Sequence, residues 1–132
     1  AMDKWRAMIS AQGGDPDKPL PVAREKEIVR AEQSGTIASM DALKVGVSAW
    51  RLGAGRERQG EKVQAGAGIE IHAKPGEKIE VGAPLFTLHT DESERFSRAL
   101  EVLNGAVVIS ESGVLAPRLP LVVTRIDSHD LT

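Results

Sequence analysis

The sequence predicts an α+β fold, with strands and helices mixed along one domain-sized chain of 132 residues. Short runs that alternate apolar and polar side chains, the period of a half-buried strand, recur after residue 23. Two longer segments instead repeat apolar residues every three or four positions, which predicts amphipathic helices among the strands. The chain has no cysteine, which excludes a disulfide framework and thiolate chemistry.

The first 22 residues predict a short helix followed by a stiff connector. Four apolar residues share one helical face, namely Met2, Trp5, Met8 and Ile9. Gly13 or Gly14 is suited to the left-handed conformation that ends a helix, and the three prolines that follow cannot continue it. We expect three segments: the end of a helix from an upstream domain at 1–14, a Pro-rich linker at 15–22, and the main domain at 23–132.

The main domain is predicted to open with a hairpin and a helix. Glu27–Ala31 and Thr36–Met40 predict two strands, and Gln33-Ser34-Gly35 between them predicts a hairpin turn. Asp41 is placed to cap a helix over Ala42–Leu52, which Gly53-Ala54-Gly55 ends. The apolar residues expected on the buried face of this helix are Leu43, Val47 and Trp50.

The second half is predicted to add strands around one more helix. The extended segments are Gly68–Lys74, Lys78–Val81, Leu85–His89 and Val107–Ser110. The helix, over Glu92–Leu103, has its expected buried face at Phe96, Ala99, Leu100 and Leu103. The acidic run Asp91-Glu92-Ser93-Glu94 falls at its first turn, where carboxylates cap free N–H groups. We therefore assign that run to helix initiation rather than to acid–base catalysis.

Composition excludes two classes of partner. Seventeen basic residues against nineteen acidic ones, with two Trp and two Phe, argue against nucleic-acid binding by phosphate neutralisation or base stacking. The longest apolar runs, Gly105–Ile109 and Leu119–Val123, are far shorter than the roughly 20 residues of a membrane-spanning helix. We expect a cytoplasmic protein without a nucleic-acid or membrane partner.

The titratable residues do not predict a catalytic or metal site. The histidines are His72, His89 and His129, and the pairs Glu70/His72 and His89/Asp91 have the spacing of residues on one strand face. A metal needs at least three converging ligands, so solvated strand ends are the favoured interpretation. Among the serines, none stands in a Gly-x-Ser-x-Gly motif, which argues against a serine hydrolase.

The loop from Gly53 to Gln64 is the strongest candidate for a functional segment. Gly53 and Gly55 open like a dinucleotide-binding fingerprint, but Arg58 occupies its third glycine position and a helix, not a strand, precedes it. A capping and loop role is favoured over direct anion binding, because a helix C-terminus repels phosphate. The polar stretch Arg56–Gln64 is the best candidate for a mobile loop.

The segment Ile69–Phe86 resembles half of a biotinyl/lipoyl-type carrier fold. It combines a strand, a Pro-Gly-Glu turn, a Val-x-x-Gly-x-Pro-Leu-like step and another strand. A carrier presents a modifiable lysine at a hairpin tip, whereas Thr87-Leu88-His89-Thr90-Asp91 follows here and Lys44 falls in a predicted helix. The pattern therefore supports the fold without the swinging arm.

Several short motifs follow one another along the chain. They are Met8-Ile9-Ser10-Ala11-Gln12-Gly13-Gly14-Asp15, Ser34-Gly35-Thr36-Ile37, Leu52-Gly53-Ala54-Gly55-Arg56, Gly66-Ala67-Gly68-Ile69 and the step over Gly76–Leu85. Together they resemble the C-terminal region of thymidine and pyrimidine-nucleoside phosphorylases, from the opening helix to about Ile126. The combination of Ala-Gln-Gly-Gly-Asp with Leu-Gly-Ala-Gly-Arg is the most specific part.

The resemblance implies one module of a larger enzyme, usually a homodimer, that splits a pyrimidine nucleoside with phosphate as co-substrate. The products are the free base and (deoxy)ribose 1-phosphate. It implies an α/β-hammerhead with a biotinyl/lipoyl-like barrel-sandwich element, preceded by a short helix. In the family the phosphate-binding and base-binding residues lie in upstream α and α/β domains, which we expect to be this module's partners. No catalytic, cofactor-binding or metal residue is therefore assigned to this chain, and we expect it to be inactive alone.

For Gly53, Gly55 and Arg56 we expect an interdomain role. Our hypothesis is that the loop orders against the upstream α domain on closure, with Arg56 making a charge-assisted contact across the cleft. The alternative is that Arg56 only caps the carbonyls of the preceding helix. Two other readings of the whole chain remain: a stand-alone biotinyl/lipoyl-like carrier or binding module, and an isolated chain with weak phosphorolysis.

Overall fold

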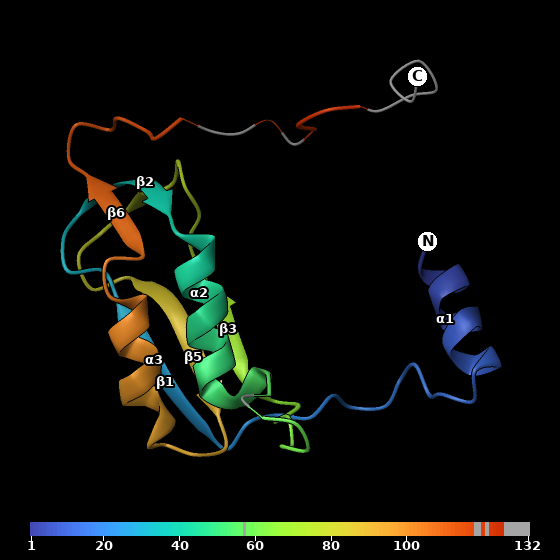
Figure 1. Ribbon diagram of the computed structural model, residues 1–132. Coiled ribbons are helices and arrows are strands. Elements are labelled where there is room, and N and C mark those ends of the chain that lie inside the picture. The colour runs from blue at the N-terminus through green and yellow to red at the C-terminus, as the bar shows by residue number, and fades with distance from the viewer. Residues whose placement is uncertain (57, 118–119, 121, 126–132) are drawn as a thin grey trace, which may run out of the picture.

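The computed structural model describes residues 1–56, 58–117, 120 and 122–125. It is an α+β structure, as the sequence predicts, with two three-stranded sheets and a layer of helices (Figure 1). The helices are α1 (Met2–Ala11), α2 (Ala42–Ala49) with the π-helical turn η1 (Trp50–Ala54), and α3 (Arg95–Leu103). The strands are β1 (Glu25–Arg30), β2 (Gly35–Met40), β3 (Gly68–Ile71), β4 (Lys78–Ile79), β5 (Pro84–Thr90) and β6 (Val107–Ser110).

Both sheets are antiparallel, and each has one long central strand. In the first sheet β5 lies between β1 and β3, with Val29 opposite Phe86 and Ile71 opposite Phe86 on the other side. In the second sheet β2 lies between β4 and β6, with Thr36 opposite both Lys78 and Ser110. Strand β4 lies between β3 and β5 in the sequence, but it pairs in the second sheet. The chain therefore crosses between the two sheets before and after β4.

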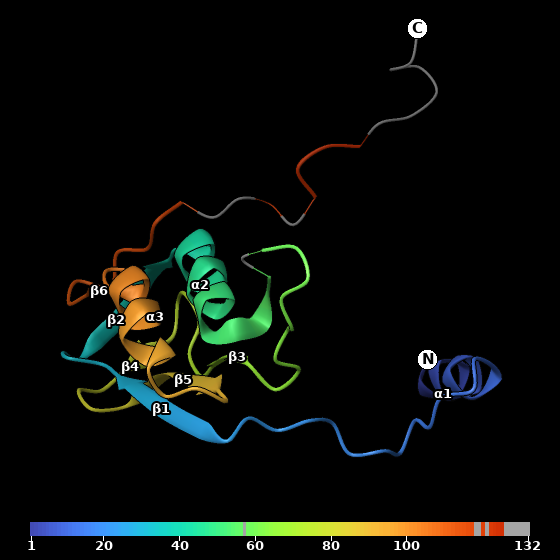
Figure 2. The same cartoon turned by 60° about the horizontal axis from the view of Figure 1, so that its bottom comes forward.

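Helices α2 and α3 lie side by side over the sheet formed by β1, β5 and β3 (Figure 2). At their contact the buried Ser48 hydroxyl donates to Ala99 O over 2.9 Å. The core lies between these helices and the sheets, and its largest fully buried apolar side chains are Phe86, Ile37, Leu52 and Leu88. This core fixes the end of η1, where the loop of residues 53–64 starts, and the end of β5, which contacts that loop through Thr90.

The predicted hairpin between the first two strands is wrong. Strands β1 and β2 belong to different sheets, and β1 pairs with β5. The chain leaves β1 at Ala31, whose N–H donates to Ala83 O while its carbonyl accepts from Gly82 N. These bonds hold the chain against the β4–β5 turn, so residues 32–34 cross between sheets instead of reversing within one.

The predicted buried face of α2 is also wrong, although its start is confirmed. Asp41 caps the helix through a 3.0 Å hydrogen bond from Lys44 N. Leu43 of the predicted face is 76% exposed, whereas Ser48 and Leu52 are fully buried. The helix faces the core through positions next to the predicted ones, because α3 packs closely enough to need a small side chain at Ser48.

Helix α3 has the face that the sequence predicts, but it begins later. Ala99 and Leu103 are buried and Phe96 and Leu100 pack against the core. The helix starts at Arg95 with no acidic residue in its first turn, so the acidic run does not initiate it as predicted. The carboxylates of that run instead bind other groups: Asp91 accepts from Arg24 N, and Glu92 from the side chains of Gln64 and Arg95.

Helix α1 stands away from the body in both views (Figures 1 and 2), and none of its residues is buried. Gly13 follows it with a positive φ of 78°, as predicted for a helix end. The predicted division at residues 14 and 22 stays a prediction. In the part of the chain that the structure describes, no helix has the length and apolar character needed to cross a membrane.

Candidate functional site

The loop after η1 begins with a chain reversal at Gly53. This residue has φ 109° and ψ 6°, a conformation that side-chain-bearing residues rarely adopt. Its carbonyl accepts a 2.9 Å hydrogen bond from Gln64 N, which closes the loop between the two residues. A Cβ at Gly53 would lie 2.7 Å from Gln64 Cδ, so the glycine also makes room for the Gln64 side chain.

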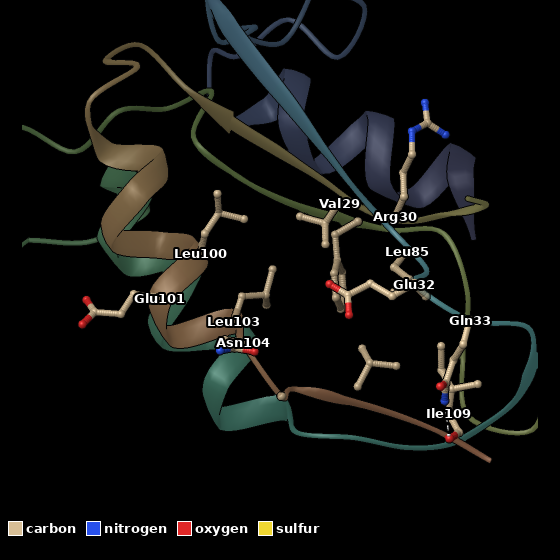
Figure 3. A pocket seen from close by; sticks show the side chains of 13 residues that line it. Val29, Arg30, Glu32, Gln33, Leu85, Leu100, Glu101, Leu103, Asn104 and Ile109 are labelled. Carbon is tan, nitrogen blue, oxygen red and sulfur yellow. Dashed lines mark hydrogen bonds between the residues drawn. The ribbon is translucent and has the colours of Figure 1, made fainter. Parts of the chain in front are cut away.

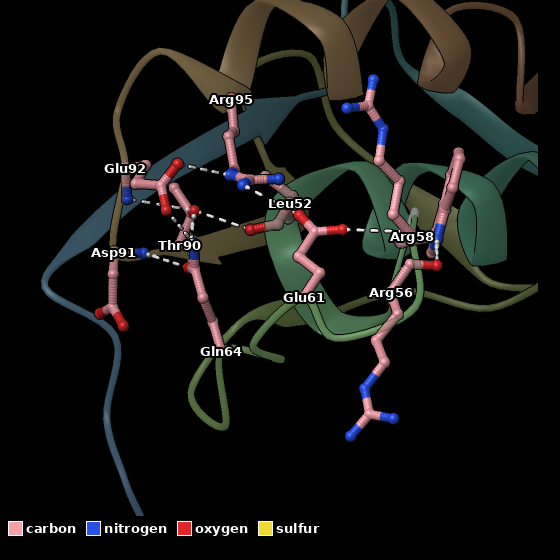
Figure 4. A network of polar contacts seen from close by, with 10 residues as sticks. Leu52, Arg56, Arg58, Glu61, Gln64, Thr90, Asp91, Glu92 and Arg95 are labelled. Carbon is pink, nitrogen blue, oxygen red and sulfur yellow. Dashed lines mark hydrogen bonds and ion pairs between the residues drawn. The ribbon is translucent and has the colours of Figure 1, made fainter.

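The Gln64 side chain connects the loop to the end of β5 (Figure 4). Its Nε2 donates to Glu92 Oε1 over 2.8 Å, and its Oε1 accepts from Asp91 N over 2.7 Å. The hydroxyl of the fully buried Thr90 lies 3.2 Å from the same Oε1 and donates to Leu52 O over 2.8 Å. The Gln64 amide thus joins the loop to the strand end, and Thr90 joins the strand end to the last turn of the helix.

An ionic chain continues from this network to the middle of the loop. Arg95 Nε donates to Glu92 Oε2 over 2.7 Å, and Arg95 Nη2 lies 3.8 Å from Glu61 Oε1. Glu61 Oε2 in turn accepts from Arg58 N over 3.2 Å. The loop is therefore bonded at its base and at Glu61, and its mobility stays a prediction.

The linker meets the far end of the loop at Gly66. A Cβ at this residue would lie 2.5 Å from Ala23 N, so backbone packs directly against backbone there. A cavity of about 460 Å³ opens beside this contact, and Arg24, Lys62, Gln64, Asp91 and Glu92 are among its lining residues. The segment through which the linker enters the body therefore lies on the same surface as the end of the loop.

Trp50 fixes the beginning of the loop. Its indole Nε1 donates to Arg56 O over 3.0 Å, and a Cβ at Gly55 would lie 2.5 Å from Trp50 Cδ1. The Arg56 guanidinium points away from the network in Figure 4 and is exposed. Among the described residues it makes no hydrogen bond or ion pair, so the capping of helix carbonyls that we considered is not observed.

The structure brings together the predicted residues Gly53, Gly55 and Arg56, and it adds three that sequence reasoning missed: Trp50, Gln64 and Thr90. Gln64 and Thr90 lie 26 residues apart in the chain. A glutamine in a polar loop and a threonine at a strand end are both common, so nothing in the sequence predicts that these two residues are in contact. Trp50 does stand out in the sequence as one of two tryptophans, but its helical spacing with Leu43 and Val47 predicts a core position instead of a contact with the loop.

His72 and His89 each contact a residue on a neighbouring strand. His89 Nε2 lies 3.7 Å from Glu70 Oε2, across the β3–β5 pairing, and His72 Nε2 lies 2.7 Å from Thr87 Oγ1. Neither Glu70/His72 nor His89/Asp91 forms a pair. No group of three or more His, Asp or Glu side chains suited to a metal occurs within the described residues, and His129 lies outside them.

A larger cavity of about 710 Å³ lies between β1, β5, α3 and β6 (Figure 3). Its lining is mixed: it includes the aliphatic side chains of Val29, Leu85 and Ile109 and the carboxylates of Glu32 and Glu101. Two polar groups at its rim are already bonded: Gln33 Nε2 donates to Ile109 O, and Arg30 Nη1 donates to Gly82 O. The cavity therefore combines apolar surface with two carboxylates, of which that of Glu101 is paired with Arg51 over 3.1 Å.

Comparison with known proteins places this arrangement in a family. The family model of the pyrimidine nucleoside phosphorylase C-terminal domain matches residues 36–110, which include both central strands and the loop. A thymidine phosphorylase of Mycobacterium tuberculosis is 51% identical over 96% of this chain, which covers 29% of the relative. A pyrimidine-nucleoside phosphorylase of Staphylococcus epidermidis is 31% identical over 95% of this chain and 30% of its own length.

A third relative is named for a different activity. An AMP phosphorylase of Pyrococcus furiosus is 34% identical over 76% of this chain and 19% of its own length. The chain thus spans less than a third of the length of each of these relatives. The family match covers more than half of the chain and agrees with the resemblance seen in the sequence. The chain belongs to the pyrimidine nucleoside phosphorylase C-terminal domain family.

Proposed function

We propose that this chain is the C-terminal module of a thymidine or pyrimidine-nucleoside phosphorylase. The reaction would convert thymidine and phosphate to thymine and 2-deoxyribose 1-phosphate, in the cytoplasm and without a further cofactor. The 51% identity to a thymidine phosphorylase over nearly the whole chain carries the proposal. The catalytic groups would lie in preceding α and α/β domains, and the parent enzyme would be a homodimer.

The module would buttress the large domain and present the Gly53–Gln64 loop to it. The support is the contrast within the loop: its base is fixed through Gln64, whereas the Arg56 guanidinium extends into solvent. A fixed base with an extended arginine suits a charge-assisted contact to a carboxylate or to backbone carbonyls. Such a contact across a closing cleft would help exclude water during phosphorolysis.

Arg56→Ala in the full-length enzyme tests this role. We expect kcat/KM for thymidine phosphorolysis to fall about tenfold, the loss of roughly 1.4 kcal/mol from one charge-assisted contact. Lys78→Ala, which removes a cation from β4 far along the chain from the loop, is the matched control and should leave kcat/KM unchanged. Unchanged kcat/KM in Arg56→Ala, together with unchanged protease sensitivity of the loop, would refute the interdomain role.

For the fold, we infer an α/β-hammerhead with a biotinyl/lipoyl-like barrel-sandwich element. The topology supports this inference, because β3 and β5 pair with each other while β4, which lies between them in the sequence, pairs in the second sheet.

The carrier alternative would need an exposed lysine at a hairpin tip. Lys44 instead lies on α2, and its Nζ donates to Asn104 O over 3.0 Å. Coexpression with a biotin or lipoate ligase tests the alternative, since a carrier gains mass on one lysine. Incubation of the 132-residue chain with thymidine and phosphate tests the remaining reading, and we expect no product without the preceding domains.

A further inference from the structure

The solvent-facing side of α2 and its π-helical turn carries an apolar stripe. Leu43, Val47 and Trp50 stand at positions i, i+4 and i+7, so their side chains share one face. Leu43 is 76% exposed and Trp50 is 38% exposed. The opposite face already supplies the core contact through Ser48 and Leu52. Val47 is half-buried and Trp50 also packs at Gly55, so Leu43 is the member of the stripe that the fold of this chain leaves most exposed.

Trp50 is held in one orientation before any partner binds. Its Nε1 is bonded to Arg56 O, and the missing Cβ of Gly55 makes room for the ring. Because the polar edge of the indole is satisfied and the ring is fixed, docking against its exposed surface costs little conformational entropy. Trp is also among the residue types that contribute most to protein interfaces.

We propose that the stripe of Leu43, Val47 and Trp50 is the face through which this module docks on the preceding domains of its own enzyme. The inference rests on the proposed function. The fitting partner surface would be apolar opposite the stripe, with a carboxylate or carbonyl group opposite Arg56, whose main chain is bonded to Trp50. The docking face and the loop would then be parts of one contact.

The size of the stripe favours a tethered partner over a second copy. A stable interface between separate proteins uses roughly 20–30 residues on each side, which three side chains do not approach. Two domains of one chain meet at an effective concentration in the millimolar range, so a small contact suffices for them. The relatives provide the necessary partner, since this chain covers only 29% of the Mycobacterium tuberculosis thymidine phosphorylase.

Leu43→Lys in the full-length enzyme tests the docking face. We expect the linker at 15–22 to be cleaved at least tenfold faster by a limiting amount of subtilisin. Trypsin is avoided because the substitution introduces a lysine. The same substitution in the 132-residue chain should leave its melting temperature unchanged, because Leu43 is mostly exposed there. Val81→Lys is the matched control: Val81 is 64% exposed in the β4–β5 turn, and its substitution should not change linker cleavage.

The outcomes separate the inference from the function on which it rests. Absence of phosphorolysis in the unsubstituted full-length protein would refute the proposed function. Normal phosphorolysis with unchanged linker cleavage in Leu43→Lys would refute the docking face alone. A lower melting temperature of the 132-residue Leu43→Lys chain would also refute it, since the stripe would then stabilise the module itself.

Discussion

At the scale of single residues, the position of the loop depends most on Gln64. Its side-chain amide acts as donor and acceptor at once, toward Glu92 and Asp91, and its main chain closes the loop on Gly53. Removal of the side chain leaves the part-buried Asp91 N without its acceptor, and an unmade hydrogen bond costs more than the bond itself contributes. The buried hydroxyl of Thr90 would lose its contact with Gln64 but keep its hydrogen bond to Leu52 O.

We therefore expect Gln64→Ala to lower the free energy of unfolding by about 2 kcal/mol. The loop should also become more sensitive to protease, since its base is released. Urea denaturation of the 132-residue chain measures the first effect and limited proteolysis the second. Gln33→Ala is the matched control, because Gln33 is exposed and makes one side-chain hydrogen bond, to Ile109 O. A loss as small in Gln64→Ala as in Gln33→Ala would contradict the anchoring role.

Two glycines with different surroundings provide a second prediction. Gly66→Ala would place a Cβ 2.5 Å from Ala23 N, and because backbone cannot yield easily we expect a loss of about 2 kcal/mol. Gly46→Ala should instead stabilise the chain by about 1 kcal/mol, since Gly46 lies inside α2 with no atom within 4 Å of a new Cβ. Thermal unfolding of both variants measures the difference, and equal effects would contradict the packing at Gly66.

At the scale of elements, the sequence predicted where most helices and strands lie but not always which way they face. The face of α3 was predicted because its apolar residues are numerous and consistently spaced, and they meet the core. For α2 the strongest apolar periodicity lies on the exposed side, and the core-facing side holds the small polar Ser48. Periodicity detects an amphipathic helix without telling a core contact from a contact with another domain.

The pairing of strands was less predictable than their positions. A turn-like sequence at Gln33-Ser34-Gly35 between two strands has the local pattern of a hairpin. The outcome is decided by distant partners instead, because the bonds of Ala31 to the β4–β5 turn direct the chain into the other sheet. The polar network around Gln64 escaped prediction for the same reason: its contacts join segments that single-sequence patterns cannot bring together.

At the scale of the whole molecule, α1 and the body behave as separate parts. Helix α1 buries no residue, and its described side-chain contact is the 3.5 Å ion pair of Arg6 with Asp17 in the linker. We expect deletion of residues 1–14 to change the free energy of unfolding of the body by less than about 0.5 kcal/mol. Urea denaturation measures it, and a loss above about 1 kcal/mol would show that α1 packs on the body in solution.

The sheet topology has a consequence for synthesis on the ribosome. Strand β1 emerges early, yet its partner β5 follows only after α2, the loop, β3 and β4, since Glu25 pairs with Thr90. Strand β2 likewise waits for β6, because Thr36 pairs with Ser110. Closing such long loops is slow, and no strand pair forms from neighbouring segments alone. During synthesis the first sheet therefore cannot be completed before Thr90 has left the exit tunnel, and the second cannot be completed before Ser110 has left it.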